Sequence, residues 1–199
     1  MHFLKGLAVF LSVLPLALSS PALPSPALSS PDLFKRDGRV VDGALIVHDI
    51  EQIKKNAITL NYTIYNWGGG FFGSFKLITI LYQTGYVTNA MKTTLADAKN
   101  AHRFNDTESF NISHAFTELL PVVHDVLFWI MTRKIYFEYG MFGLWSLTST
   151  VRSILISQQD LSNQMGNEII PKLNELWASV GPLLLKQINN YFNEAINFF

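Results

Sequence analysis

Residues 144–180 have the sequence LWSLTSTVRSILISQQDLSNQMGNEIIPKLNELWASV, in which apolar side chains recur at alternating steps of three and four residues. Such steps mark one face of an α-helix, because 3.6 residues complete a helical turn. Only Gln158 interrupts the apolar face. The pattern continues past Pro171, which predicts a kinked or closely re-entrant helix rather than a new domain. Gly181-Pro182 predicts a second break, and residues 183–199 then form a final amphipathic stripe.

The part of the chain between residue 40 and this stretch shows the same spacing. Residues 40–67 carry one apolar face, and we expect their helix to end at Gly68-Gly69-Gly70, because three consecutive glycines cannot sustain a helix. A second helix is predicted to begin near residues 72–75 and to end at about Asn100.

A polar loop and a third apolar stripe complete the pattern. Residues 101–109 are rich in helix-capping side chains, so we predict a loop with a helix start near Asp106 or Thr107. The following stripe contains Pro121, which we expect to divide it into a short and a longer helix. No strand pattern or sequence repeat is visible. The predicted fold is therefore all-α, a single-domain bundle of about five or six amphipathic helices.

The first 36 residues have the pattern of a secretory leader. Residues 1–19 combine a basic start, an apolar stretch too short to span a bilayer comfortably, and small residues before a cut, which predicts a signal peptide. Residues 20–36 are a Pro/Ser-rich propeptide or spacer ending at Lys35-Arg36, a candidate dibasic processing site. An ordinary exposed charge pair is the alternative interpretation. The mature domain is then residues 37–199.

The composition narrows the class of protein. Removal of residues 1–36 takes three of the 15 Lys and Arg and one of the 15 Asp and Glu, leaving a net charge of −2. There is no basic excess to neutralise phosphates, so nucleic acid is not an expected partner. The chain has no cysteine, which excludes thiol catalysis and Cys-based zinc sites and leaves packing to stabilise a secreted domain.

The search for catalytic chemistry is negative. The four histidines after the leader, His48, His102, His114 and His124, do not have the i, i+4 spacing of a helical metal site. No nucleophile elbow, phosphate loop or dinucleotide fingerprint occurs. We therefore expect no enzyme activity, no cofactor and no metal site.

Three sequons follow the leader, at Asn61, Asn105 and Asn111. In a chain that enters the secretory pathway these are candidate N-glycosylation sites if they are exposed. Asn105 and Asn111 flank a polar stretch and are the better candidates, whereas Asn61 falls within a predicted helix.

The aromatic content is unusually high. Phe, Tyr and Trp make up 13% of the chain, against 15% for all charged residues. Most of these side chains are expected to fill the core, but several lie outside the clean stripes, which predicts a wide interior or an exposed apolar patch. The run from Trp67 to Phe75 is a candidate for such a binding surface, or equally a Gly-rich turn flanked by core aromatics.

A family resemblance follows from short segments spread over the chain. They are Val41-Asp42-Gly43, Asp49-Ile50, Leu119-Leu120-Pro121-Val122-Val123, Arg133-Lys134, Phe137-x-x-Gly140 and Ile170-Pro171. Together with the leader they resemble the fungal family of hydrophobic surface binding protein A and the antigenic cell wall galactomannoproteins. The resemblance implies a secreted helical domain that adsorbs to hydrophobic surfaces or holds a fatty-acid-like lipid between its helices. No lipid-anchor signal of the kind found in galactomannoproteins is recognised, so we expect an extracellular protein, either free or associated with the cell wall.

The favoured hypothesis is a secreted protein with a fatty-acid-like lipid in an inter-helix cavity. One alternative is a surface-adsorbing structural cell-wall protein without a defined ligand, and another is a secreted effector with a protein partner. The expected partners are lipid, another hydrophobic ligand or surface, or cell-wall material, with no transmembrane segment in the mature chain. The predicted cavity residues are Phe75, Ile78, Leu127, Ile130, Leu147, Val151 and Ile154.

Overall fold

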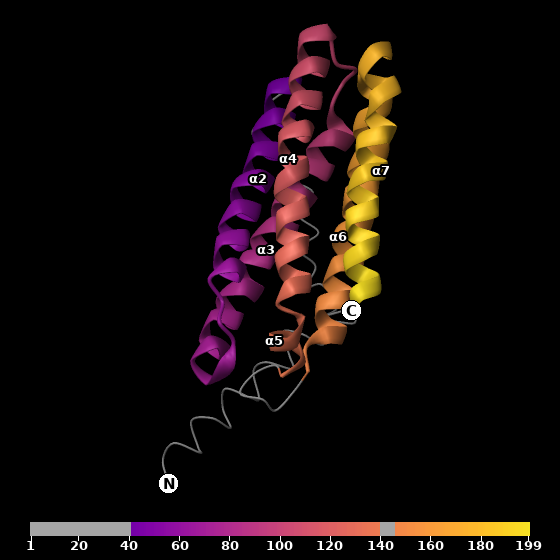
Figure 1. The fold of residues 1–199 in the computed structure, drawn as a ribbon. Helices are drawn as coiled ribbons and strands as arrows, with labels where there is room; N and C mark the ends of the chain where they lie inside the picture. The colour runs from indigo at the N-terminus through magenta and orange to yellow at the C-terminus, as the bar shows by residue number, and fades with distance from the viewer. Residues whose placement is uncertain (1–40, 140–145) are drawn as a thin grey trace, which may run out of the picture. The chain divides into compact units, whose positions relative to one another are not determined.

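The computed structural model describes residues 41–139 and 146–199 of the chain, apart from the side chains of Phe71 and Phe72 (Figure 1). The predicted signal peptide, the spacer and the Lys35-Arg36 processing site lie outside the described residues, and they stay predictions.

The described residues contain six α-helices and one short 3₁₀ helix, and no strand, which confirms the all-α prediction. The helices are α2 (Gly43–Tyr65), α3 (Gly70–Asn100), α4 (Asp106–Thr132), α5 (Lys134–Glu138), α6 (Thr148–Ile169), η3 (Ile170–Lys172) and α7 (Glu175–Phe198).

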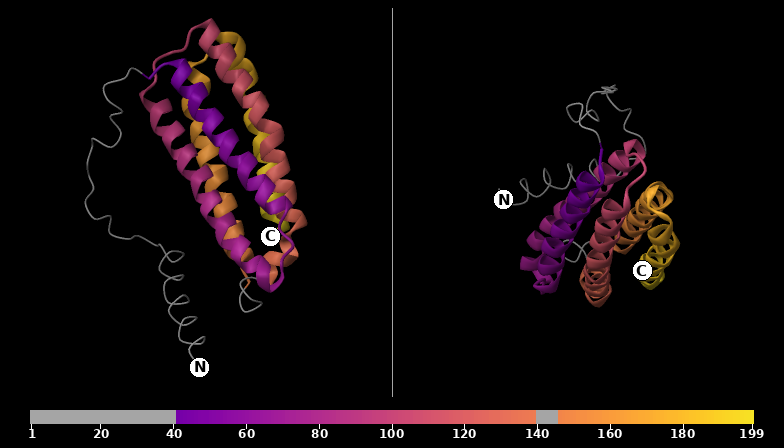
Figure 2. Two further views of the ribbon diagram at one scale, coloured as in Figure 1. Left: turned by 90° about the vertical axis from the view of Figure 1, so that its left-hand side faces the viewer. Right: turned by 90° about the horizontal axis from the view of Figure 1, so that it is seen from above.

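The five long helices form a closed ring. Helix α2 contacts α3 and α4, α4 contacts α7, α7 contacts α6, and α6 contacts α3. Helices α2, α4 and α7 run in one direction and α3 and α6 run in the other (Figures 1 and 2). Because each helix has two neighbours, each turns its apolar stripe toward one shared interior.

Capping side chains explain where several helices begin. Asp42 caps α2 through a 2.9 Å hydrogen bond that its carboxylate accepts from the Leu45 N–H. Asn105 caps α4 in a reciprocal pair with Glu108, whose carboxylate accepts a 3.0 Å bond from the Asn105 N–H. The second Glu108 oxygen accepts a 2.9 Å bond from the Gly43 N–H at the start of α2. One carboxylate therefore joins the starts of two helices.

The predicted helix end at the three glycines and the predicted loop at residues 101–109 are confirmed. Helix α2 ends just before the three glycines, and Gly69 and Gly70 adopt φ values of 66° and 72°, which a residue with a Cβ rarely adopts. The chain then leaves α3 at Asn100 and re-enters a helix at Asp106, within the predicted loop.

The breaks predicted at Pro121 and at Gly181-Pro182 are wrong. Pro121 lies inside a continuous α4 and Pro182 lies inside a continuous α7. Both proline side chains are exposed, so each costs a single helical hydrogen bond on the solvent side while the inner face continues to pack. The chain instead reverses at η3, where Pro171 ends the α6 direction and Asn174 caps α7 with a 3.1 Å bond from the Trp177 N–H. The re-entrant option at Pro171 is therefore the observed one.

Helix α4 is long and apolar enough to cross a membrane, judged by its length and composition within the described residues. In the structure it packs as a bundle helix against α2 and α7. Glu118 on its outer face accepts a 2.6 Å hydrogen bond from the Lys54 ammonium of α2, and this bond lowers the pKa of that carboxyl below its usual range.

The Glu108 connection yields a stability prediction. The Glu108→Ala variant loses the acceptor for the Gly43 and Asn105 N–H groups, so we expect a loss of about 1–2 kcal/mol in the free energy of unfolding. Urea unfolding followed by circular dichroism measures the loss. Glu51→Ala is the matched control, because Glu51 is an exposed glutamate on the outer face of α2. Equal unfolding free energies for the two variants would contradict the role given to Glu108.

Candidate functional site

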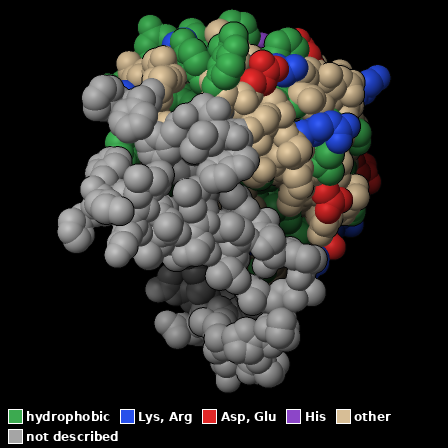
Figure 3. Space-filling model, turned by 90° about the horizontal axis from the view of Figure 1, so that it is seen from below, with side chains coloured by type: hydrophobic (Ala, Val, Ile, Leu, Met, Phe, Trp, Pro, Cys, Tyr) green, Lys and Arg blue, Asp and Glu red, His purple; other side chains and the backbone are tan. Residues whose placement is uncertain are grey.

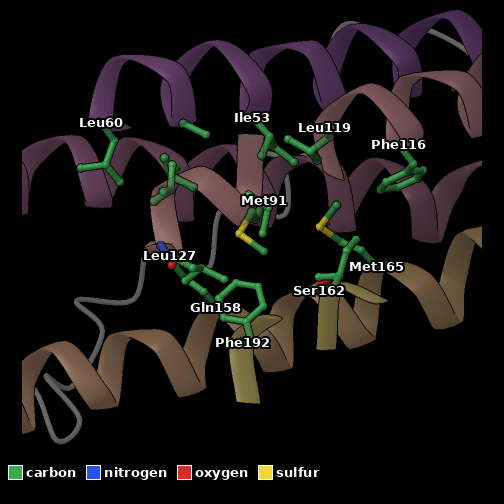
Figure 4. A pocket seen from close by; sticks show the side chains of 15 residues that line it. Ile53, Leu60, Met91, Phe116, Leu119, Leu127, Gln158, Ser162, Met165 and Phe192 are labelled. Atoms are coloured by element: carbon green, nitrogen blue, oxygen red, sulfur yellow. The ribbon is translucent and has the colours of Figure 1, made fainter. Parts of the chain in front are cut away.

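The interior of the ring contains an apolar cavity of about 60 Å³ (Figure 4). All five long helices contribute to its wall, and side chains such as Met91, Leu127 and Phe192 point into it from different helices. The lining residues are Ile53, Ala57, Leu60, Val87, Met91, Phe116, Leu119, Val123, Val126, Leu127, Gln158, Ser162, Met165, Ile188 and Phe192.

Two polar side chains lie in this otherwise apolar wall, and both come from α6. Gln158 donates a 3.1 Å hydrogen bond from Nε2 to the Thr88 hydroxyl of α3. Ser162 lies one helical turn further along α6. A few polar groups in an apolar pocket are the usual means by which a site orients an amphiphilic ligand.

A second cavity of about 40 Å³ lies beside the first, toward η3. The two cavities share Phe116, Ser162 and Ile188 as wall residues. Its other lining residues are Ser113, Gly166, Ile169, Ile170, Leu173, Gly181, Leu184 and Leu185. The Phe116 side chain is therefore part of the wall of both apolar spaces.

The volumes limit what these cavities hold without rearrangement. Pockets for drug-sized ligands measure roughly 300–1,000 Å³, whereas these cavities measure about 60 and 40 Å³. A long acyl chain fits only if lining side chains change rotamer. Met91 and Met165 suit this requirement, because the unbranched thioether side chain adapts to irregular spaces at low cost.

Among the predicted cavity residues, Leu127 lines the central cavity. Ile130, Leu147 and Val151 are buried in the core but outside its wall. Ile78 and Ile154 are half-buried and also lie outside the wall.

The assignment of Phe75 to the cavity is wrong, because its side chain is 60% exposed. Helix α3 begins at Gly70, and from this start Ser74 and Leu77 face the interior with 2% and 0% exposure. The inner face is therefore one position away from the face predicted at this end of the helix. Phe71 and Phe72 obscured the choice, since aromatics at consecutive positions supply an apolar side chain to more than one face.

Sequence reasoning missed the contributions of α2 and α7 to the wall, although it placed their apolar stripes correctly. It also passed over Gln158, which interrupts the stripe of α6 and lies in the cavity wall. A polar residue within an otherwise unbroken apolar seam was the available signal, because a buried amide needs a partner.

The aromatic residues beside the glycine turn divide between core and surface. Trp67 is 2% exposed, its Nε1 donates a 2.9 Å bond to the Gly73 carbonyl, and its ring meets the edges of Tyr136 and Phe137. At Gly69 an added Cβ would lie 2.5 Å from the Tyr136 ring, so this turn packs directly on α5. For Trp67 the interpretation as a core aromatic is therefore the observed one.

Cation–π contacts hold the same end of the bundle together. The Arg133 guanidinium lies 5.5 Å from the ring centres of both Trp129 and Tyr136, and it donates a 2.8 Å bond to the Tyr65 carbonyl. Lys134 donates a 2.8 Å bond to the Phe198 carbonyl and lies 5.1 Å from the ring centre of Phe198. Hydrophobic side chains gather along one edge of the described part of this end (Figure 3).

Fold and cavity together define a class, the helical-bundle proteins with an apolar interior site. The sequence profile of the family "hydrophobic surface binding protein A" matches residues 43–171. The chain belongs to this family, which confirms the resemblance found in the sequence.

Solved structures with the same fold carry bound fatty acids. AfMP4p in complex with palmitic acid has a TM-score of 0.72 at 18% identity, over 79% of this chain and 99% of that one. Ligand binding domain 1 of the Penicillium marneffei MP1 protein, complexed with arachidonic acids, has a TM-score of 0.67 at 13% identity, over 76% of this chain and 93% of that one. Ligand binding domain 2 of the same protein, complexed with multiple arachidonic acids, has a TM-score of 0.67 at 14% identity, over 76% of this chain and 91% of that one. No curated protein sequence matches the chain.

The cavity can be tested by filling it. Ala57 lines the cavity and Ala115 is an equally buried alanine outside its wall. We expect Ala57→Leu to be neutral or to stabilise the protein by up to about 1 kcal/mol, because the added carbons occupy existing space. Ala115→Leu should destabilise it by about 1–3 kcal/mol through overpacking. Urea unfolding measures both changes, and an equal loss in both variants would contradict the cavity.

Proposed function

We propose that the protein is a secreted carrier that binds a fatty-acid-like lipid in the cavity between its five long helices. The observation that carries this proposal is an apolar interior space that every long helix lines, with two polar side chains on one wall. The fatty acids held by AfMP4p and by the MP1 domains, which have the same fold, support it.

The binding chemistry follows from the wall. Burial of the acyl chain contributes about 25 cal/mol per Å² of apolar surface removed from water. The hydroxyl of Ser162 and the amide of Gln158 are the groups that can meet a carboxyl head inside the ring. Met91, Met165 and Phe116 change rotamer to extend the space along the bundle.

The extracellular location is part of the same proposal. Residues 1–19 direct secretion, the spacer at 20–36 is removed after Lys35-Arg36, and residues 37–199 act as the mature domain. The compact unit that begins at Val40 supports this division. Asn105 and Asn111 are exposed and suit glycosylation, whereas Asn61 is half-buried with its Oδ1 atom enclosed.

We propose binding rather than catalysis as the activity. The family description names a binding function, and the structures with this fold are described by their bound fatty acids.

Adsorption to a hydrophobic surface or to cell-wall material is the second candidate function. The observation that favours it is a group of exposed aromatics at the end of the bundle that holds α5, namely Tyr62, Tyr65, Phe128, Tyr139 and Phe198, with exposures from 46% to 71%. Aromatic side chains of this kind favour interfaces. In this function the ring stays closed and no ligand enters it.

Native mass spectrometry of the secreted protein separates the two functions. A carrier shows a bound mass of fatty-acid size that is lost on delipidation and restored by added palmitic acid. A protein that shows only its own mass, even with palmitic acid present, and is still depleted from solution by hydrophobic beads would contradict the carrier.

A pair of methionine variants places the site. In Met165→Trp the larger side chain fills part of the central cavity. We expect it to weaken palmitic acid binding by about tenfold or more, since placing extra atoms in a space that the ligand needs costs about 1–3 kcal/mol. Met131→Trp is the control, because Met131 lies on α4 outside the wall. Equal affinities in the two variants would place the ligand elsewhere.

A further inference from the structure

A third hollow lies on the surface, where α6 and η3 face α7. It is an open groove of about 520 Å³. Its lining residues are Gly166, Asn167, Ile170, Pro171, Pro182, Leu185, Lys186, Asn189, Asn190 and Asn193.

This groove borders the second cavity. The groove and the second cavity share Gly166, Ile170 and Leu185. The second cavity in turn shares Phe116, Ser162 and Ile188 with the central one. The three spaces are therefore neighbours in order from solvent to the centre of the ring, and each adjoining pair shares wall residues.

Leu185 forms the outer barrier. A Cβ built at Gly166 would lie 2.7 Å from Leu185 Cδ2, so the leucine side chain is seated directly on the bare backbone of α6. Rotation of this one side chain removes the contact, and such rotamer changes are fast compared with ligand binding. Phe116 is the corresponding inner barrier.

Hydrogen bonds between side-chain amides hold the seam between α6 and α7, and bonds to water can replace them. Asn189 donates a 2.6 Å bond from Nδ2 to Asn163 Oδ1, and Gln159 donates a 2.8 Å bond from Nε2 to Asn193 Oδ1. Each such bond contributes only about 0.5–1.5 kcal/mol against water. The buried Oδ1 of Asn189 has no hydrogen-bond partner, so opening the seam to water satisfies an acceptor that closure leaves unpaired. These features lower the free energy needed to part the two helices.

The charge at the rim fits an acid. The groove lining contains one cation, the exposed Lys186, together with four asparagine and two proline side chains and no carboxylate. An ammonium at the mouth of a groove without opposing negative charge attracts a carboxylate and raises its local concentration.

We propose that a fatty acid reaches the central cavity through the seam between α6 and α7, past Leu185 and then Phe116, and that Lys186 attracts its carboxylate at the rim. The proposal rests on the proposed function, because it needs a fatty acid bound inside the ring. It adds the route of exchange and the residues that control its rate.

A reversible crosslink across the seam tests this route. The Cβ built at Gly166 lies 3.3 Å from Leu185 Cγ, and Leu185 Cβ is one bond from that atom. The distance between the two Cβ atoms is therefore close to the range of about 3.5–4.5 Å that a disulfide needs. The chain has no cysteine of its own, so a Gly166→Cys, Leu185→Cys variant forms a single defined crosslink.

The readout is stopped-flow association of cis-parinaric acid, a fluorescent fatty acid. We expect the oxidised variant to associate at least about tenfold more slowly than wild type, and the reduced variant to recover the wild-type rate or exceed it, because a closed gate limits association. Equal rates for oxidised and reduced protein, with wild type binding normally, would overturn the route and leave the proposed function intact. Failure of wild type to bind would overturn both.

The role of Lys186 has its own matched pair of variants. Lys186→Glu and Lys92→Glu change the net charge equally, but Lys92 lies on the exposed face of α3 away from the groove. We expect Lys186→Glu to slow association several-fold at low salt, with the difference shrinking as salt is added. Equal rates in the two variants would overturn the part played by the lysine.

Discussion

The burial of five apolar stripes in one shared interior is the constraint on which the rest of the structure depends. With no cysteine in the chain, packing must hold the ring together. Each long helix contacts two others, so a change in one stripe is felt by both neighbours. A ring of five helices also leaves its axis farthest from every backbone, and the central cavity lies there, lined by side chains from all five.

Both ends of the ring are closed by close packing. Gly43 lies against Glu108 at one end, and Gly69 lies against Tyr136 at the other, in contacts too close for an added Cβ. Cation–π contacts of Arg133 reinforce the second end. The middle is instead filled by Met91 and Met165, side chains that adapt their shape. The proposed expansion of the cavity uses these adaptable side chains, and the proposed route to solvent uses the amide-bonded seam between α6 and α7.

The sequence predicted the fold better than the site. Helical periodicity, Gly68–Gly70 and the capping side chains of residues 101–109 located most boundaries, because these signals act within a few residues. Pro121 and Pro182 misled, since packing of the inner face outweighs the local cost of a proline on the solvent side.

The cavity wall was harder to predict because it depends on how helices meet. Periodicity shows that a helix has an apolar face, but every core residue on that face is an equal candidate for the wall. Leu127 and Val151 looked alike in sequence, yet only the first lines the cavity. Gln158 differed from the other core residues, because a polar side chain in an apolar stripe is visible in the sequence, and it lies in the cavity wall.

The central claim is that a fatty acid lies inside the ring in contact with every wall. Its most direct test is nuclear Overhauser spectroscopy between uniformly labelled palmitic acid and the methionine methyl groups of the protein. We expect contacts from the acyl chain to Met91 and Met165, which both line the cavity, and none to Met131, which lies near the end of α4 outside the cavity wall. Contacts confined to Met131, or to surface residues near the exposed aromatics, would show that the lipid binds outside the ring and would contradict the account.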